Sequence, residues 1–368
     1  MCEKGQHNTA VQPIGSVDSY PSASLHDNPL LYPGVRPGTS FLVDDELVFA
    51  VDVRAKEGAL DYSIVSPDGT RAAIDEYLAV RGVACLESRI PILAYGANMC
   101  PASLKSKFTK IGRPDGLIVP TIYAQLKGHD IVWSGGPGAN GNFIANLYTG
   151  PETLETTVTI GINFLTQEQL LVMHATEMSY DLTTIEVTVE GVNIKALVYA
   201  GIDDILIRDG KPVAVDATNA IGRGLESTDT ESLLLEMLSD KEIAEDLVKL
   251  GGVPAGTNVD MYIQQVRKLA HISGGKLARK KAIHTVFRYY NRSRSYQLIR
   301  SEAAMQSWAN PSTIPTYGEQ LEGTAHNSIY LLPSQVLDKD KWDPERREKV
   351  LSSMGTHLMR LTGLAEAE

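Results

Sequence analysis

Between residues 91 and 201 the chain repeats one pattern, a short apolar run that ends in a glycine-containing turn. In one run, Val158, Ile160, Ile162 and Phe164 fall on one face of an extended chain, and polar or small residues fall on the other. Short runs of this kind are typical of antiparallel strands. They predict a small, mostly antiparallel β-barrel. The strands are expected over residues 91–95, 117–126, 131–133, 143–148, 157–165, 186–190 and 193–199.

The flanking regions have other patterns, so the chain is expected to divide into four units. Residues 1–38 are rich in Pro, Ser, Gly and Asn and predict a flexible N-terminal tail or an extended arm. Residues 39–88 predict a small α+β appendage with a helix over 71–81, and residues 89–205 form the expected barrel. Residues 206–368 predict a mostly helical C-terminal extension. Its helices are expected over 230–238, 241–250, 259–272, 276–290 and 344–361. The fold class expected is α+β.

The composition limits the classes of partner and the cell compartment that we expect. The net charge of −11 argues against a nucleic-acid partner, because the mean field repels phosphate. The stretch 276–300 is basic and aromatic, a composition that can bind phosphates or nucleic acid. We favour a solvated helix face or a partner of the acidic segment 229–246, and leave open a docking site for a phosphate-bearing or acidic partner or substrate. No apolar run reaches the ~18 residues of a membrane span. Three scattered cysteines suit a reducing compartment, so we expect a cytoplasmic protein without a membrane partner. A homo-oligomer stays open.

One strand leads into a loop suited to binding. The apolar run from Pro91 ends at Tyr95, and Gly96, Ala97, Asn98 and Met99 follow before a helix is expected to begin at Pro101. Backbone N–H groups at the start of a helix can bind a carboxylate or stabilise an oxyanion. A glycine in such a loop lets another group approach the backbone closely.

A carboxylate far downstream is the second candidate. Thr166 and Gln169 have the spacing of a capping box, which predicts a short helix from Gln167. Glu177 falls near the end of this helix, on its apolar stripe. Burial and a helix C-terminus both disfavour an ionised carboxyl, which suits a proton shuttle. The alternative is an ordinary surface glutamate. His174 has no second ligand pair at helical spacing, so no metal is expected.

The loop Tyr95-Gly96-Ala97-Asn98-Met99 resembles the Tyr-Gly-Ser-Asn-Met/Leu loop of the γ-glutamyl cyclotransferase-like proteins. The resemblance continues through Trp133-Ser134-Gly135-Gly136 to Glu177 and Tyr180, and it covers roughly residues 91–201. It implies a small barrel. It also implies an enzyme that cleaves a γ-glutamyl amide by attack of the substrate's own α-amine, with release of 5-oxoproline and a free amine.

The resemblance also implies a role for each site residue. Glu177 would be the general acid and base, no metal or organic cofactor is needed, and the partner is a small γ-glutamyl amide or peptide. Ala97 and Met178 stand where the family has serine and often has glycine. Two alternatives are therefore kept: hydrolysis or transfer at a related amide, and a non-catalytic binding or scaffold module of the same fold. The residues that would bind the substrate are Tyr95, Gly96, Ala97, Asn98, Met99 and Tyr180.

Overall fold

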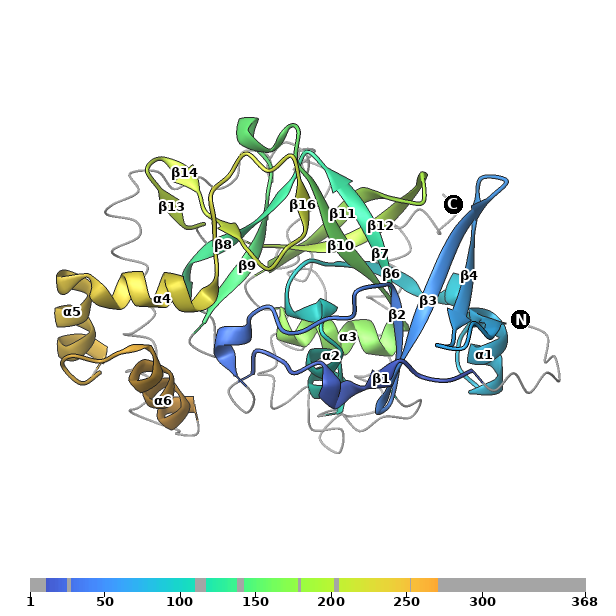
Figure 1. The fold of residues 1–368 in the computed structure, drawn as a ribbon, viewed down its shortest axis with the longest axis horizontal. Helices are drawn as coiled ribbons and strands as arrows, with labels where there is room; N and C mark the ends of the chain where they lie inside the picture. The colour runs from blue at the N-terminus through green and yellow to red at the C-terminus, as the bar shows by residue number, and fades with distance from the viewer. Residues whose placement is uncertain are drawn as a thin grey trace, which may run out of the picture.

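The protein is a mixed α+β molecule dominated by one large sheet, as a computed structural model shows (Figure 1). The expected helices over 276–290 and 344–361 and the basic stretch 276–300 lie outside the described residues. The residues described are 11–24, 28–109, 117–137, 142–177, 180–201, 205–251 and 253–270.

The large sheet has eleven strands, and every pairing in it is antiparallel except the one between β6 and β12. β1 (Gly15–Ser16) pairs with β3 outside the main path. Along the main path the order is β16 (Ala220–Ile221), β10 (Thr157–Leu165), β6 (Ile90–Ala94), β12 (Val192–Gly201), β11 (Tyr180–Val189), β7 (Ile118–Lys127), β2 (Phe41–Asp44), β3 (Leu47–Lys56), β4 (Ala59–Val65) and β5 (Arg71–Ala73).

Five strands of this sheet pair in a ring, because β7 contacts β10 as well as β11. The link from β11 to β7 rests on Thr188 opposite Gln125, whereas β7 and β10 pair from Thr121 to Lys127. The ring is therefore uneven and is not a regular barrel. The α+β class is confirmed, and the specific barrel fold stays a prediction.

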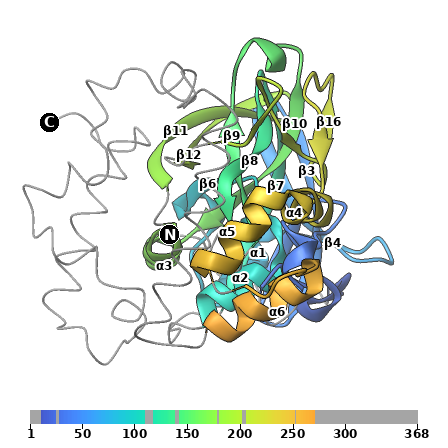
Figure 2. The same ribbon diagram turned by 90° about the vertical axis from the view of Figure 1, so that its left-hand side faces the viewer.

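A smaller sheet and six α-helices complete the described part of the chain. The smaller sheet has the order β17 (Ser227–Thr228), β15 (Ala214–Val215), β8 (Asp130–Pro137) and β9 (Phe143–Tyr148), and a hairpin joins β13 (Ile207–Arg208) to β14 (Lys211–Pro212). The helices are α1 (Ile74–Val80), α2 (Pro101–Thr109), α3 (Gln167–Thr176), α4 (Thr230–Ser239), α5 (Lys241–Gly251) and α6 (Val259–Ala270). Helices α4–α6 lie at the end of the molecule opposite α1 (Figure 1), and Figure 2 views that end.

The central strands are buried on both faces, which explains why their apolar runs are continuous. In β6, Ile92 and Leu93 belong to different hydrophobic clusters, as do Leu197 and Val198 in β12. Helices α2 and α3 cover one face through the cluster that contains Leu104, Phe108, Leu170 and Met173. This packing brings the C-terminal ends of α2 and α3 to the same side of the sheet.

The N-terminal region packs on the rest of the molecule. Within the flexible tail or extended arm expected over 1–38, residues 11–24 and 28–38 make specific contacts: β1 pairs with β3, Val17 is completely buried and Tyr32 is nine-tenths buried. Composition averages over a segment, whereas a few well-placed apolar side chains are enough to hold it. Residues 39–88 also belong to the large sheet, because β2 pairs with β7.

Two further boundaries move. The helix expected over 71–81 begins at Ile74, because Arg71–Ala73 pairs with β4 as a strand. The extension from residue 206 is not helical at first, since the five short strands β13 to β17 lie between residues 207 and 228. Beyond them, α4, α5 and α6 follow the three helices expected within residues 230–272 closely.

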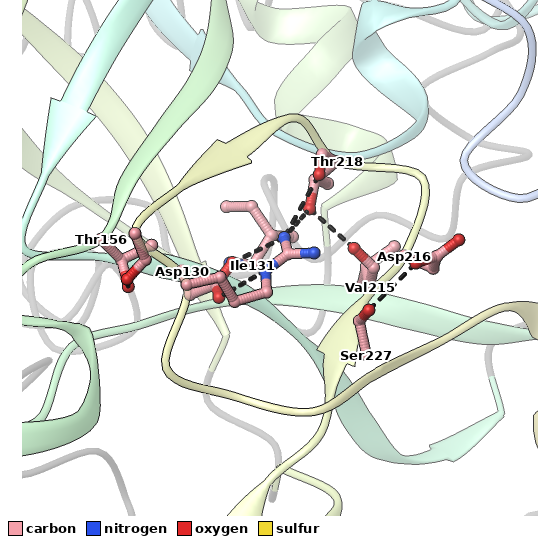
Figure 3. Close-up of polar contacts among 9 residues, drawn as sticks. Asp130, Ile131, Thr156, Val215, Asp216, Thr218 and Ser227 are labelled. Carbon is pink, nitrogen blue, oxygen red and sulfur yellow. Dashed lines mark hydrogen bonds and ion pairs between the residues drawn. The ribbon is translucent and has the colours of Figure 1, made fainter.

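A buried ion pair ties this strand-rich segment to the smaller sheet. Asp130, which is fully buried, accepts two hydrogen bonds of 2.9 Å from Arg223, and the Arg223 side chain is 15% exposed. The same guanidinium donates to the Thr218 hydroxyl at 2.6 Å and to its carbonyl at 3.2 Å. Asp130 and Thr218 thus converge on one cation (Figure 3). The bidentate geometry holds the loop after β15 against the start of β8.

Breaking this pair should destabilise the fold strongly. Arg223→Met leaves the Asp130 carboxylate buried without its cation, so we expect the free energy of unfolding to fall by about 3–5 kcal/mol. Urea denaturation of the full chain measures it. The control is Arg54→Met, which removes an exposed pair with Asp52 and should cost less than about 1 kcal/mol. Equal losses in the two variants would contradict the anchoring role.

Candidate active site

The predicted loop lies where expected, between β6 and α2. Residues Ala97–Met99 form one turn of 3-10 helix, in which Met99 N–H donates to the Gly96 carbonyl at 3.1 Å and Cys100 N–H to the Ala97 carbonyl at 3.0 Å. A Cβ atom on Gly96 would lie 2.7 Å from the Tyr32 hydroxyl oxygen. Glycine is therefore required here by the close approach of a side chain from the N-terminal segment.

The polar face of β10 contacts the loop and holds it in place. Asn163 donates from Nδ2 to the Asn98 carbonyl at 3.1 Å and accepts at Oδ1 from the Thr121 hydroxyl at 2.9 Å. Gly161 leaves room for Met99, because a Cβ atom there would lie 3.3 Å from Met99 Cγ. Polar or small residues alternate with apolar residues along β10, and the polar or small ones hold the loop in position.

Glu177 directly follows α3, and the predicted capping box starts that helix. Thr166 N–H donates to Gln169 Oε1 at 3.0 Å, and Gln169 N–H donates to Thr166 Oγ1 at 3.2 Å. The Glu177 side chain is 11% exposed, so it is not an ordinary surface glutamate. Asn98 Nδ2 donates to its Oε1 at 3.2 Å. The structure therefore brings together two predicted site residues that lie 79 positions apart.

Sequence reasoning missed Lys107. This lysine lies in α2, its ammonium forms an ion pair with Glu177 Oε1, and its side chain is 19% exposed. Its Nζ atom also lies 3.5 Å from Met173 Sδ. In a pair as buried as this, each charge offsets part of the cost of burying the other. The amphipathic pattern of α2 gives no signal for this contact, because the partner lies far along the chain, just after α3.

Two predicted tyrosines donate to backbone carbonyls. The Tyr95 hydroxyl donates to the Tyr199 carbonyl, and the Tyr180 hydroxyl donates to the Ala145 carbonyl at 2.9 Å. Burial raises the pKa of Tyr95 well above its usual value, and the charge of Glu177 raises it further. Both phenols are positioned by the surrounding strands, and Tyr95 stays protonated beside the carboxylate.

Asn98 carries an unused acceptor. Its Oδ1 atom is buried and has no hydrogen-bond partner within the described part of the chain, while its Nδ2 contacts Glu177. Buried polar atoms without a partner are uncommon in folded proteins, and they often mark binding sites. A carboxylate and an amide oxygen side by side suit a ligand that donates two or more hydrogen bonds, such as a primary ammonium.

Comparisons with models of known families, with curated proteins and with solved structures find no match to this chain. In the part that the structure describes, none of the helices is long and apolar enough to cross a membrane.

Lys107 and Glu177 should be energetically coupled. In a double-mutant cycle of Lys107→Met and Glu177→Gln, each single change leaves one partly buried group without its partner, so we expect a coupling energy of about 1–3 kcal/mol by urea denaturation. The control is the cycle of Lys105→Met, on the same helix, and Glu46→Gln. Glu46 is 60% exposed, so this pair should have a coupling energy of less than about 1 kcal/mol. A Lys107–Glu177 coupling energy below that of the control would show that the contact is incidental.

Proposed function

We propose that the protein is a γ-glutamyl cyclotransferase-like enzyme of the cytoplasm, built on an uneven form of that family's barrel. It would cleave a γ-glutamyl amide or peptide and release 5-oxoproline and a free amine. The contact between Asn98 and Glu177 is the observation that carries the proposal. It joins the loop and the carboxylate of the sequence resemblance in one partly buried site.

The reaction needs a base, an acid and donors to an oxyanion. Glu177 takes a proton from the substrate α-ammonium, and the freed nitrogen lone pair attacks the γ-carbonyl carbon. The carbonyl electron pair moves to oxygen as the new C–N bond forms. When the oxyanion collapses, the old C–N bond breaks. In all, two protons leave the attacking nitrogen and two reach the departing nitrogen, with Glu177 as acceptor and donor in turn.

Substrate binding can use the contacts already present. The Lys107 ammonium occupies one position on the Glu177 carboxylate, and a substrate ammonium has the same charge and the same donors. It can replace Lys107 there and use the unpartnered Asn98 Oδ1 as a second acceptor. The loop holds the γ-glutamyl group close to its own amine, which favours cyclisation.

The Lys107 contact also favours the second candidate, a binding module of the same fold that does not turn over its ligand. If the lysine cannot leave Glu177, the carboxylate cannot act as a base. These two functions and the hydrolysis alternative differ in their products: cyclisation releases 5-oxoproline, hydrolysis of the amide releases glutamate, and a binding module releases neither.

Glu177→Gln tests the catalytic role. The change keeps the size of the side chain and its contact with Asn98 but removes the proton acceptor, so we expect kcat for 5-oxoproline release to fall by about 10²-fold or more. The assay uses wild type and variant on a panel of γ-glutamyl amines and peptides. Glu186→Gln, at an exposed position of β11, is the control and should keep wild-type activity.

The panel also separates the alternatives. If the wild type releases glutamate and no 5-oxoproline, the reaction is hydrolysis. If Glu177→Gln is as active as the wild type, Glu177 is not the acid or base. If no member of the panel yields either product while one or more bind, the binding module is the better account.

A further inference from the structure

The N-terminal segment delivers a phenol to the candidate site. Tyr32 follows a 3-10 helix, Pro29–Leu31, whose first turn is capped by the Asn28 side chain at 3.0 Å from Leu30 N. Its ring packs on Trp133 with centroids 5.7 Å apart, and its carbonyl accepts from the Thr230 hydroxyl at 3.5 Å. Contacts with β8 and α4 therefore fix a side chain that is 9% exposed.

The Tyr32 hydroxyl lies directly against the loop. Its oxygen accepts the Ala145 N–H at 2.8 Å. The backbone N–H of Ala97, in the loop, also lowers the pKa of the phenol. The 2.7 Å separation from a Cβ atom built on Gly96 shows how closely the hydroxyl approaches the backbone. Residue 96 is thus a glycine because Tyr32 occupies the space that a side chain would need.

The hydrogen of this hydroxyl is unused. The Ala145 N–H donates to a lone pair of the phenol oxygen, so the hydroxyl's own hydrogen points in another direction. Within the described residues no atom accepts it. Tyr95 and Tyr180 differ in this respect, because their hydroxyls donate to the carbonyls of Tyr199 and Ala145.

The surroundings keep Tyr32 a neutral donor. Burial raises the pKa of this phenol far above its usual value, the N–H group of Ala145 lowers it in part, and the charge of the Glu177 carboxylate raises it again. The phenol therefore stays protonated throughout the ordinary pH range. Donation by the Ala145 N–H to its oxygen also polarises the O–H bond and strengthens it as a donor.

We infer that Tyr32 is a further catalytic residue, which donates its hydroxyl hydrogen to the γ-carbonyl oxygen of the bound substrate as that oxygen becomes negative. The inference rests on the proposed function, because it needs a substrate with a γ-glutamyl group bound beside Glu177. The donor is already oriented by the Ala145 N–H and by packing on Trp133, so little reorganisation accompanies the reaction. Attack on the carbonyl carbon moves an electron pair to the oxygen, and the Tyr32 hydrogen bond strengthens at that moment; no proton needs to transfer.

Tyr32→Phe tests this role. Only the hydroxyl is lost, and we expect kcat for 5-oxoproline release to fall by about 10²–10³-fold, the usual effect of removing one oxyanion donor, with KM changed by less than about threefold. The matched control is Tyr123→Phe. Tyr123 donates to the Pro37 carbonyl at 2.6 Å, so this variant also loses one phenol contact to the same N-terminal segment and should keep kcat. Thermal unfolding confirms that both variants are folded.

A second readout tests the substrate's carbonyl oxygen, the expected acceptor of the Tyr32 hydrogen bond. In a γ-thioamide substrate, sulfur replaces the carbonyl oxygen and accepts hydrogen bonds poorly. The wild type should discriminate against this substrate by more than the Tyr32→Phe variant does, because the variant has already lost the donor. A structural role for Tyr32 would slow both substrates equally.

The outcomes are distinct. If the wild type releases 5-oxoproline and Tyr32→Phe retains its kcat, the inference is wrong and the proposed function stands. A large fall in kcat for Tyr123→Phe as well would assign the effect to the position of the segment, which also overturns the inference. If the wild type releases no 5-oxoproline from any γ-glutamyl substrate, the proposed function fails and the role of Tyr32 fails with it.

Discussion

Strand β7 holds the molecule together, because it pairs with β2, β10 and β11. Through β2 it joins the N-terminal hairpins to the central strands. It also pairs with β10, whose polar face holds the loop of residues 96–99. Pro120 fits this arrangement: it lies opposite Leu42 of β2, and the pairing with β10 extends only to Thr121. A proline lacks the N–H that pairing on both sides would need. The two-sided burial of the sheet, and with it the placement of α2 and α3, depends on this strand.

Two ion pairs whose side chains are all less than one-fifth exposed have different surroundings. Asp130 and Arg223 form a bidentate pair whose hydrogen bonds are satisfied by Thr218 and the backbone, which is the pattern of a structural anchor. Lys107 and Glu177 instead meet beside an unpartnered Asn98 oxygen. A site that leaves a buried acceptor without a partner is less stable than it could be, and such a cost is typical of positions kept for binding.

The N-terminal segment places the Tyr32 side chain against the loop of the candidate site. Residues 28–38 contribute little regular structure, yet Tyr32 lies between Trp133 and the loop and fills the space above Gly96. The residues of the sequence resemblance and a residue outside it therefore meet in one place. The segment also contacts α4, because the Thr230 hydroxyl donates to the Tyr32 carbonyl. The helical region after residue 229 therefore helps to position Tyr32.

Local patterns in the sequence determined the strands around the loop, the capped start of α3, the helices after residue 229 and the pairing of the loop with Glu177 as one site. Each of these depends on neighbours within a few positions or on the known order of a motif. The tertiary structure alone decided that Lys107 contacts Glu177, 70 positions away, and that Tyr32 reaches Ala145, 113 positions away. It also decided that residues 39–88 extend the central sheet. Such contacts depend on the path of the whole chain, and neither the hydrophobic period of a helix nor the composition of a segment records which distant backbone will lie against it.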